Sequence, residues 1–411
     1  TFVGKSLKNK TIELLYHGKE ISDLLNDTKR ISLTKEDLEM FSPNTLAPPI
    51  ILTKHDLGLA KKVYSKFGVL TNKNTKNNHW KVAIRRMLSL SDGENLFAKS
   101  YELEESDKLI GAQWIKLYSG KAIYHYNHRF AFYKNKKWNN STEVDYQDST
   151  NSIVTEYYAK YEEVLKRTNQ QKPNGYLIGY RDIARATDER TCIASVVPRV
   201  GCDSHCRNIY FEDASELLIV SFLCNMNSIV FDYFVRQKVI GTGLGSGAFE
   251  QLPILPPTIY TKNNLELIIP KAFELVYSSW DIKSFADDVW KEADADLKAA
   301  ITKQWEENRE VTGGHEWEPP EWCAIDETGC PLPPFKWDES RRALLKAELD
   351  AIYAKLYGLT TEELRYILDP QDVYGPDFPG ETFRVLKEKE IRNFGEYRTK
   401  RLVLEAWGKL N

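Results

Sequence analysis

Hydrophobic and polar positions divide the chain into a mixed first part and a helical last part. Residues 1–48 alternate short apolar pieces with polar turns, so we expect a connector there. Apolar positions between residues 57 and 67 recur at helical spacing. Residues 80–87 then alternate as a half-buried strand, with Lys81 and Arg85 on its polar side.

The centre of the chain combines strand patterns with two strongly apolar helices. KAIYHYNHRFAFY, residues 121–133, has the clearest period-2 alternation, and residues 152–167 have the pattern of an amphipathic helix. Further strands are expected at 176–184 and 191–197 around the loop ARATDERT, helices at about 214–224 and 228–237, a glycine-rich loop at 241–247 and a strand at QLPILPP.

After residue 260 the pattern becomes helical. Acidic amphipathic segments at 280–309 and 339–356 flank a loop at 313–334 that is rich in Pro, Gly and Trp. We therefore predict an α+β fold, with a connector (1–48), a mixed recognition domain (49–260) and a mainly helical C-terminal domain (261–411).

Charge is distributed unevenly along this chain of 411 residues, whose net charge is -3. Residues 50–101 contain 10 Lys/Arg and 3 Asp/Glu, whereas residues 281–350 contain 9 and 18. A polyanion would be attracted to the first region and repelled by the second. Six cysteines without a secretory leader favour reduced thiols and a cytoplasmic protein. The apolar run 217–235 contains Asn225, Asn227 and Asp232, which favours core helices over a membrane span.

Motifs for catalysis and metal binding are weak or incomplete. Cys202, His205 and Cys206 in CDSHC could supply three zinc ligands, but a fourth ligand is lacking and we predict no metal. The glycine run has no Gly-Lys-Ser/Thr ending, and the chain has neither a Gly-x-Ser-x-Gly elbow nor a His-Glu-x-x-His helix. A nuclease-like reading of Asp377 and Glu388 fails because position 390 is Glu390 and not lysine. We predict no catalytic or cofactor-binding residue in this chain.

Side chains suited to DNA are, in contrast, abundant. Arginine matches phosphate and guanine edges, and asparagine or glutamine matches adenine. The candidates for contacts to phosphates or bases are Lys61, Lys62, Arg85, Arg86, Asn127, Arg129, Arg181, Arg185, Arg190, Arg199, Gln237, Lys238 and Thr242. The alternative is that the lysines form a solvated helix face and that several arginines pair with carboxylates such as Asp182, Asp188 or Glu189.

Several long motifs in order resemble one protein family. They are YHYNHRFAFY, GYRDIARATDERTCIASVVPRVG, NSIVFDYFVRQKVIGT, QLPILPP and LRYILDPQDVYGPDFPGETFRVLKEKEIRNFGEYRTKRLVLEAW. This pattern, from about Ile31 to the C-terminus, resembles the C-terminal half of large adenine-specific DNA methyltransferases. Such proteins occur as type IIG-like restriction-modification enzymes and as the DISARM phage-defence methylase. QLPILPP also resembles the closing strand of target recognition domains in type I specificity subunits.

The resemblance implies that cofactor binding and catalysis belong to a domain outside this chain. In the family, a separate N-terminal domain binds S-adenosylmethionine and holds the flipped adenine through an Asn/Asp-Pro-Pro-Tyr/Phe motif. Here Leu332 precedes Pro333, Pro334 and Phe335, so the amide or carboxylate of that motif is missing. A chain that begins at Thr1 is also expected to be a fragment or a processed product, and CDSHC departs from the family pattern.

The resulting hypothesis is a sequence-specific double-stranded DNA recognition part of an N6-adenine methyltransferase from a bacterial defence system. Its expected partners are DNA, the methyltransferase domain or subunit, and other defence proteins, with no membrane. The alternative is a protein-interaction subunit that docks a nuclease or a helicase through the acidic helices. An intact enzyme with an unrecognised active site is a third, weaker hypothesis.

Overall fold

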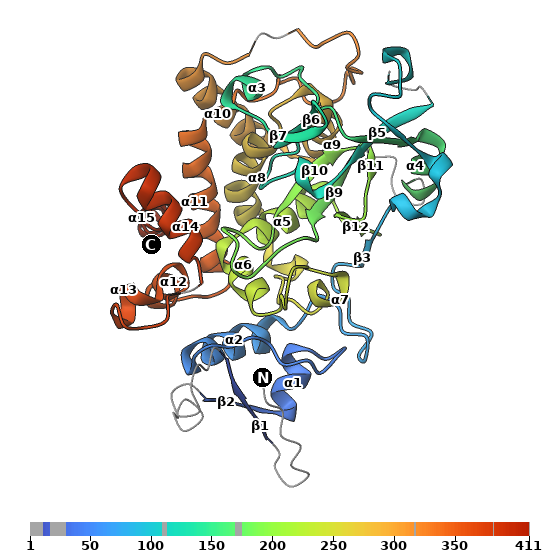
Figure 1. Ribbon diagram of the computed structural model, residues 1–411. Helices are drawn as coiled ribbons and strands as arrows, with labels where there is room; N and C mark the ends of the chain where they lie inside the picture. The colour runs from blue at the N-terminus through green and yellow to red at the C-terminus, as the bar shows by residue number, and fades with distance from the viewer. Residues whose placement is uncertain are drawn as a thin grey trace.

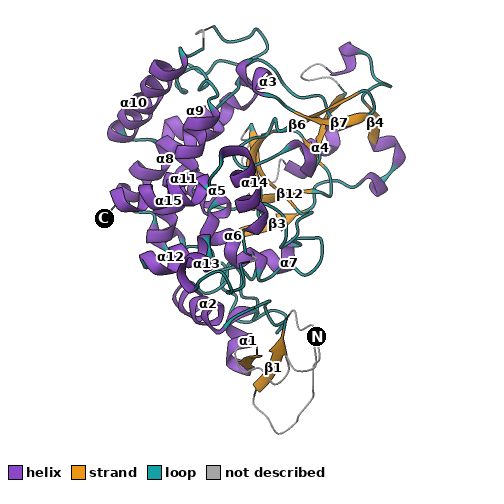
Figure 2. Ribbon diagram, turned by 60° about the vertical axis from the view of Figure 1, so that its left-hand side comes forward, coloured by secondary structure: helices purple, strands orange, loops and turns teal. Residues whose placement is uncertain are grey.

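The computed structural model describes residues 11–16, 30–108, 113–168, 175–315, 318–380 and 382–410. The fold is α+β, as the sequence predicts, with several small sheets and a helical C-terminal region. Figure 2 shows most of the helices on one side of the molecule and most of the strands on the other.

A four-stranded antiparallel sheet lies at the centre. Its strands, in the order β10-β9-β12-β3, are β3 (Val82–Arg85), β9 (Tyr176–Arg181), β10 (Ala194–Pro198) and β12 (Cys206–Phe211). As expected, Trp80 and Val82 are buried and Lys81 and Arg85 are exposed. Trp80 is fixed further by a hydrogen bond from its Nε1 to Leu255 O at 2.9 Å.

A second sheet packs beside the first over a smaller core. Its order is β11-β5-β8-β4, with β4 (Phe97–Lys99), β5 (Trp114–Tyr118), β8 (Tyr157–Lys160) and β11 (Gly201–Cys202). Only the short β11–β5 pair within this sheet is parallel. The core includes Leu117 and Ala159 of the second sheet together with Val197 and Cys206 of the first. The hairpin β6 (Ala131–Lys134) and β7 (Lys137–Asn140) and the short helices α3 (Glu143–Gln147) and α4 (Tyr161–Thr168) complete this part.

Two consecutive helices, α5 (Glu216–Asn227) and α6 (Ile229–Arg236), form the middle of the larger core. The hydroxyls of Ser215 and Ser228 cap their N-termini. Within the described residues no single helix is long and apolar enough to cross a bilayer. Together, α5 and α6 meet that criterion by length and composition, with a bend of 58° between them.

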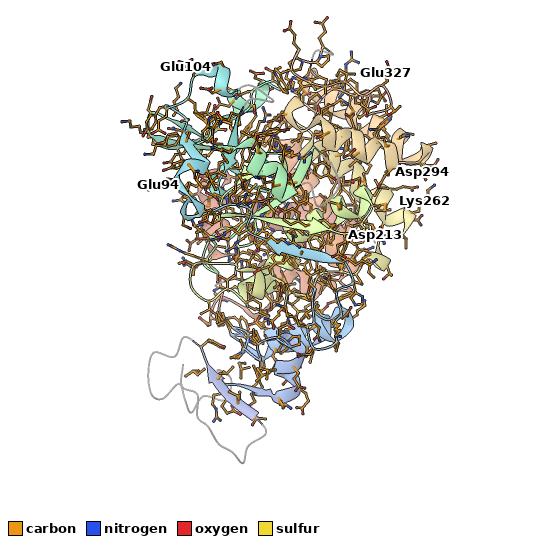
Figure 3. All side chains as sticks on the ribbon, turned by 90° about the vertical axis from the view of Figure 1, so that its right-hand side faces the viewer. Glu94, Glu104, Asp213, Lys262, Asp294 and Glu327 are labelled. Atoms are coloured by element: carbon orange, nitrogen blue, oxygen red, sulfur yellow. The ribbon has the colours of Figure 1, made fainter. Side chains whose placement is uncertain are left out.

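The C-terminal helices share this core with the central sheet. They are α8 (Lys262–Val276), α9 (Lys283–Glu292), α10 (Ala295–Thr312), α11 (Glu339–Leu356), α12 (Thr361–Leu368), α13 (Pro370–Tyr374), α14 (Arg384–Phe394) and α15 (Arg398–Lys409). One apolar cluster runs from Leu14 to Trp407, so packing is continuous across the expected domain boundary at residue 260. At the surface, Lys262 of α8 pairs with Asp294 at 3.0 Å, next to α10 (Figure 3).

The described part of the N-terminal segment is folded. The hairpin β1 (Thr11–Leu15) and β2 (Arg30–Thr34) leads into α1 (Lys35–Phe41) and α2 (Lys54–Phe67), at one end of the molecule (Figure 1). Both helices begin with a capping box, formed by Thr34 with Asp37 and by Thr53 with Asp56. The rest of the expected connector, residues 1–10 and 17–29, lies outside the described residues.

Three predicted elements are wrong. Residues 121–133 do not form one strand, because the chain reverses between Tyr124 and Asn127, where Tyr126 has a φ of 56°. Residues 152–167 form β8 and then α4 in place of one helix. QLPILPP is not a strand: its three prolines remove the N–H donors of a ladder. Side chains hold it instead, because Asn225 Oδ1 accepts from Leu255 N at 3.0 Å and Tyr357 Oη donates to Pro253 O at 2.9 Å.

Candidate nucleic-acid interface

Four loops meet at one end of the central sheet, at residues 119–121, 181–185, 203–205 and 240–245; we call them together the loop surface. Ile183 and Gly243 form a β-bridge, and Leu244 N donates to Asp182 O at 2.7 Å. Asp182 N in turn donates to His205 O at 3.2 Å. The backbone of residue 120 is so close to the 203–205 loop that a Cβ on Gly120 would lie 2.5 Å from His205 O. Only glycine fits there, so the sequence enforces this contact.

Exposed side chains on the loop surface combine positive charge with apolar bulk. Lys121, Arg185 and Thr242 are exposed, and so are Ile183 (56%) and Ile240 (71%). Among the described residues, neither the ammonium of Lys121 nor the guanidinium of Arg185 has a hydrogen-bond or ion-pair partner. Large apolar side chains beside free cations are suited to a ligand that carries negative charge and has flat apolar surfaces, such as stacked bases.

The carboxylates of these loops are already engaged. Asp182 pairs with His205 at 3.1 Å and with Arg207 at 3.5 Å, and Asp203 Oδ1 accepts from His205 N at 2.8 Å. Burial raises the pKa of Asp203. The loop surface therefore presents cations outward while its acidic groups hold the loops together.

Arg185 is positioned by backbone contacts on both sides. Its N–H donates to Asp188 Oδ2 at 3.0 Å, and its carbonyl accepts from Thr191 Oγ1 at 2.9 Å. Together with the bond from Asp188 N to Arg185 O at 3.1 Å, these short-range bonds form a turn that the sequence ARATDERT encodes locally. Because the backbone of Arg185 is already fixed, binding a ligand would cost the side-chain entropy of this arginine but no further ordering of the loop.

Two buried residues of α6 hold the same loop from below. Asp232 accepts from Arg190 Nε at 2.5 Å and from Thr191 N at 3.0 Å. Arg236 donates to the carbonyl oxygens of residues 186, 188 and 189 at 2.7 to 3.0 Å. We did not predict either role, because these residues lie some 40 positions from the loop and resemble ordinary residues of a core helix. The exposed Ile183 and Ile240 were also missed: Ile183 fell within the expected strand 176–184, whereas Ile240 had a signal as an apolar residue directly before the glycine-rich loop.

Five predicted DNA contacts are corrected, because their side chains are buried or are held by partners inside the protein. Arg129 is 1% exposed and donates to the carbonyl oxygens of Asp148, Asn151 and Ser278. Arg190 is held by Asp232, as described above. The others are Asn127 and Gln237, which are buried, and Lys238, which is half-buried. Lys238 donates to Phe41 O and Ser42 Oγ, and desolvation lowers its pKa to about 7. None of these five side chains is part of the loop surface.

The remaining candidates lie apart from one another. Lys61 pairs with Asp37 at 2.7 Å and Lys62 with Glu363 at 2.6 Å, as the alternative of a charged helix face implied. Arg86 contacts Asp92 at 3.4 Å, and Arg199 donates to Thr168 Oγ1 at 3.3 Å. None of these four joins the loop surface.

Arg85 and Arg181 pack over aromatic rings. Arg85 is exposed and lies over the ring of Tyr210, 5.8 Å from its centroid. Arg181 lies 5.5 Å and 5.2 Å from the ring centroids of Tyr124 and Phe130, at the edge of the loop surface. Of the thirteen predicted DNA contacts, the structure thus brings Arg181, Arg185 and Thr242 together.

The three residues of CDSHC do not converge. Cys202 and Cys206 are buried in the smaller core, whereas His205 is exposed and turns to Asp182. Within the described residues, no group of three or more His, Cys, Asp or Glu side chains is placed to hold a metal ion.

Comparison with known proteins does not assign this chain to a family. No model of a known protein family and no curated protein sequence matches this chain. The functional argument therefore depends on the residues of the loop surface and on the sequence motifs given above.

Proposed function

We propose that this chain is the target-recognition part of an N6-adenine DNA methyltransferase and binds double-stranded DNA with sequence specificity. The observation that carries the proposal is Arg185, an exposed arginine on a loop fixed from two sides, whose guanidinium has no partner in the part of the chain that the structure describes. Arginine is the side chain that most often reads guanine, through two hydrogen bonds to its major-groove edge.

The surroundings of Arg185 fit a duplex. Lys121 supplies a charge for a backbone phosphate, and Thr242 supplies a short hydroxyl. Ile183 and Ile240 are exposed where apolar contact with a thymine methyl or a base step would bury them. The link to a methyltransferase comes from the motif resemblance, with S-adenosylmethionine bound by a domain that this chain does not contain.

The test is binding of the chain to duplexes selected from a randomised pool, measured by fluorescence anisotropy across a salt series. Affinity should fall steeply with salt, because phosphate contacts release counterions. Arg185→Ala should cost about 1 to 3 kcal/mol on the selected duplex and relax one base position, whereas Lys121→Ala should weaken all duplexes alike.

Arg309→Ala is the matched control, because Arg309 is an exposed arginine on the acidic helix α10. It should bind DNA like the unmodified chain. If Arg185→Ala weakens every sequence equally, base reading by Arg185 is wrong. No duplex binding even at low salt, together with capture of a protein partner through α9–α11, would instead favour the protein-interaction subunit.

A further inference from the structure

A cleft of about 440 Å³ separates the C-terminal helices from the sheet region, and DNA recognition by the loop surface does not use it. One wall consists of α11, α14 and α15. The other consists of residues 124–130, Tyr146 and the end of the ARATDERT loop. Its volume lies within the roughly 300 to 1,000 Å³ that is common for small-molecule sites.

Each of the three helices contributes one face to the cleft. Residues 339, 342, 343, 346, 347 and 350 of α11 line it, and so do 386, 389, 390, 393 and 394 of α14 and 398, 399 and 402 of α15. Residues three or four apart lie on the same side of a helix, so these are three continuous faces. The cleft is therefore built by regular secondary structure and not by loose loops.

Cations gather on these faces. Lys346, Arg342 and Arg398 come from the helices, and Arg190 comes from the opposite wall. Lys346 is 3.8 Å from its nearest ion-pair partner, Glu339. Arg342 is 3% exposed, and within the described residues its buried Nε has no hydrogen-bond partner.

The carboxylates around the cleft are largely occupied elsewhere. Glu189 pairs with Lys389 at 2.6 Å across the cleft, and Glu390 accepts from Thr399 N at 2.7 Å. Asp350 Oδ1 accepts from Ile229 N at 2.7 Å, and burial raises its pKa to about 6. Desolvation, with Arg342, Arg190 and Arg398 nearby, lowers the pKa of Lys346. An anion placed here would relieve this mutual repulsion.

Flat apolar surfaces lie next to the cations. Tyr124 and Phe130 stack with their ring centroids 4.8 Å apart, and both are half-buried at the wall. Phe394 is 49% exposed, and the guanidinium of Arg398 lies 3.9 Å from its ring centroid. A ligand with one aromatic end and one anionic end would use both features.

We infer that the cleft binds a nucleoside phosphate, with the phosphate between Lys346 and Arg398 and the base against Phe394. The ligand bridges α11 and α15, which already pack against each other. This site is separate from DNA recognition by the loop surface and does not depend on it.

Isothermal titration of the full chain with AMP, ATP and pyrophosphate tests the inference. AMP or ATP should bind, and Lys346→Met should weaken binding at least tenfold. Phe394→Ala should weaken the nucleotides but not pyrophosphate. Lys303→Met, which removes an exposed lysine of α10, should bind like the unmodified chain.

Three outcomes would overturn the inference. They are no heat of binding with any probe at millimolar concentration, equal nucleotide affinity in Lys346→Met, and equal loss of pyrophosphate and nucleotide in Phe394→Ala. A parallel titration with duplex DNA separates the sources of phosphate. If Lys346→Met lowers only the DNA affinity, the cations of the cleft contact the DNA backbone and do not form a nucleotide site. Thermal melting of each variant confirms that it is folded.

Discussion

Asp350 is a buried carboxylate that accepts a hydrogen bond from the backbone, although burying its charge lowers the stability of the fold. It is 5% exposed and accepts the first N–H of α6 from Ile229. Desolvation is the largest effect on its pKa, which rises from 3.8 to about 6, although Arg190 and Lys346 oppose the rise. The carboxylate is thus charged at neutral pH at the expense of folding stability.

Asp350→Asn should stabilise the protein at neutral pH. Between pH 3.8 and about 6 the folded state binds a proton that the unfolded state has lost, so this group's contribution to stability falls as pH rises and stays low above pH 6. Asparagine keeps an oxygen for Ile229 N without the charge. We expect the free energy of unfolding to increase by about 1 to 3 kcal/mol at pH 7.5 and to be unchanged near pH 4.

Urea denaturation at the two pH values measures this effect. Asp213→Asn is the control, since Asp213 is 82% exposed and its contact with Lys81 is 3.4 Å long (Figure 3). It should change stability by less than about 0.5 kcal/mol. An equal gain for Asp350→Asn at both pH values would show that relief of charge is not the cause.

At the scale of elements, α6 supports the loop that carries Arg185. Arg236 makes three hydrogen bonds to loop carbonyls, and a fourth joins it to Thr382 O before α14. Its guanidinium also lies 4.4 Å from the ring centroid of Phe383. One side chain of a core helix therefore ties a surface loop to the C-terminal helices.

Arg236→Met should release this loop without unfolding α6. Methionine retains the apolar stem but loses every donor, so amide hydrogen exchange in residues 185–191 should accelerate by about ten-fold or more. Exchange in the middle of α6 should change much less. Arg309→Met is the control, and unchanged exchange in the loop would contradict the role of Arg236.

At the scale of the whole molecule, Asp281 joins the sheet region to the C-terminal helices. Its Oδ1 accepts from His128 Nε2 at 2.8 Å and also from Ser279, and its Oδ2 accepts from Ser152 Oγ at 3.2 Å. The side chains of His128 and Asp281 are 1% and 9% exposed. Burial opposes the shift, but His128, followed by the charge of Arg129 and the hydrogen bond from Ser279, lowers the pKa of Asp281.

Asp281→Ala should destabilise the protein by about 3 to 5 kcal/mol, because it leaves a buried imidazole and two hydroxyls without their acceptor. Urea denaturation at pH 7 measures the loss. Glu39→Ala removes an exposed pair with Lys35 and should cost less than about 0.5 kcal/mol. A loss below 1 kcal/mol for Asp281→Ala would show that the two parts do not depend on this contact.

The sequence by itself determined the elements whose signals are local. Helical spacing and apolar alternation predicted α2, α5, α6, α11 and the strands β3, β9 and β10, because these signals act within a few residues. The turn that fixes the backbone of Arg185 is also encoded locally. Hence the α+β class and this loop arginine were predictable.

Only the tertiary structure decided which polar side chains face outward. The sequence offered Arg129 and Arg185 alike as DNA contacts, but the guanidinium of Arg129 donates to carbonyls of residues 148, 151 and 278, whereas that of Arg185 has no partner among the described residues. Asp232 and Asp350 likewise gain their roles from partners tens of residues away. Burial depends on contacts between distant segments, and a one-dimensional pattern does not contain them.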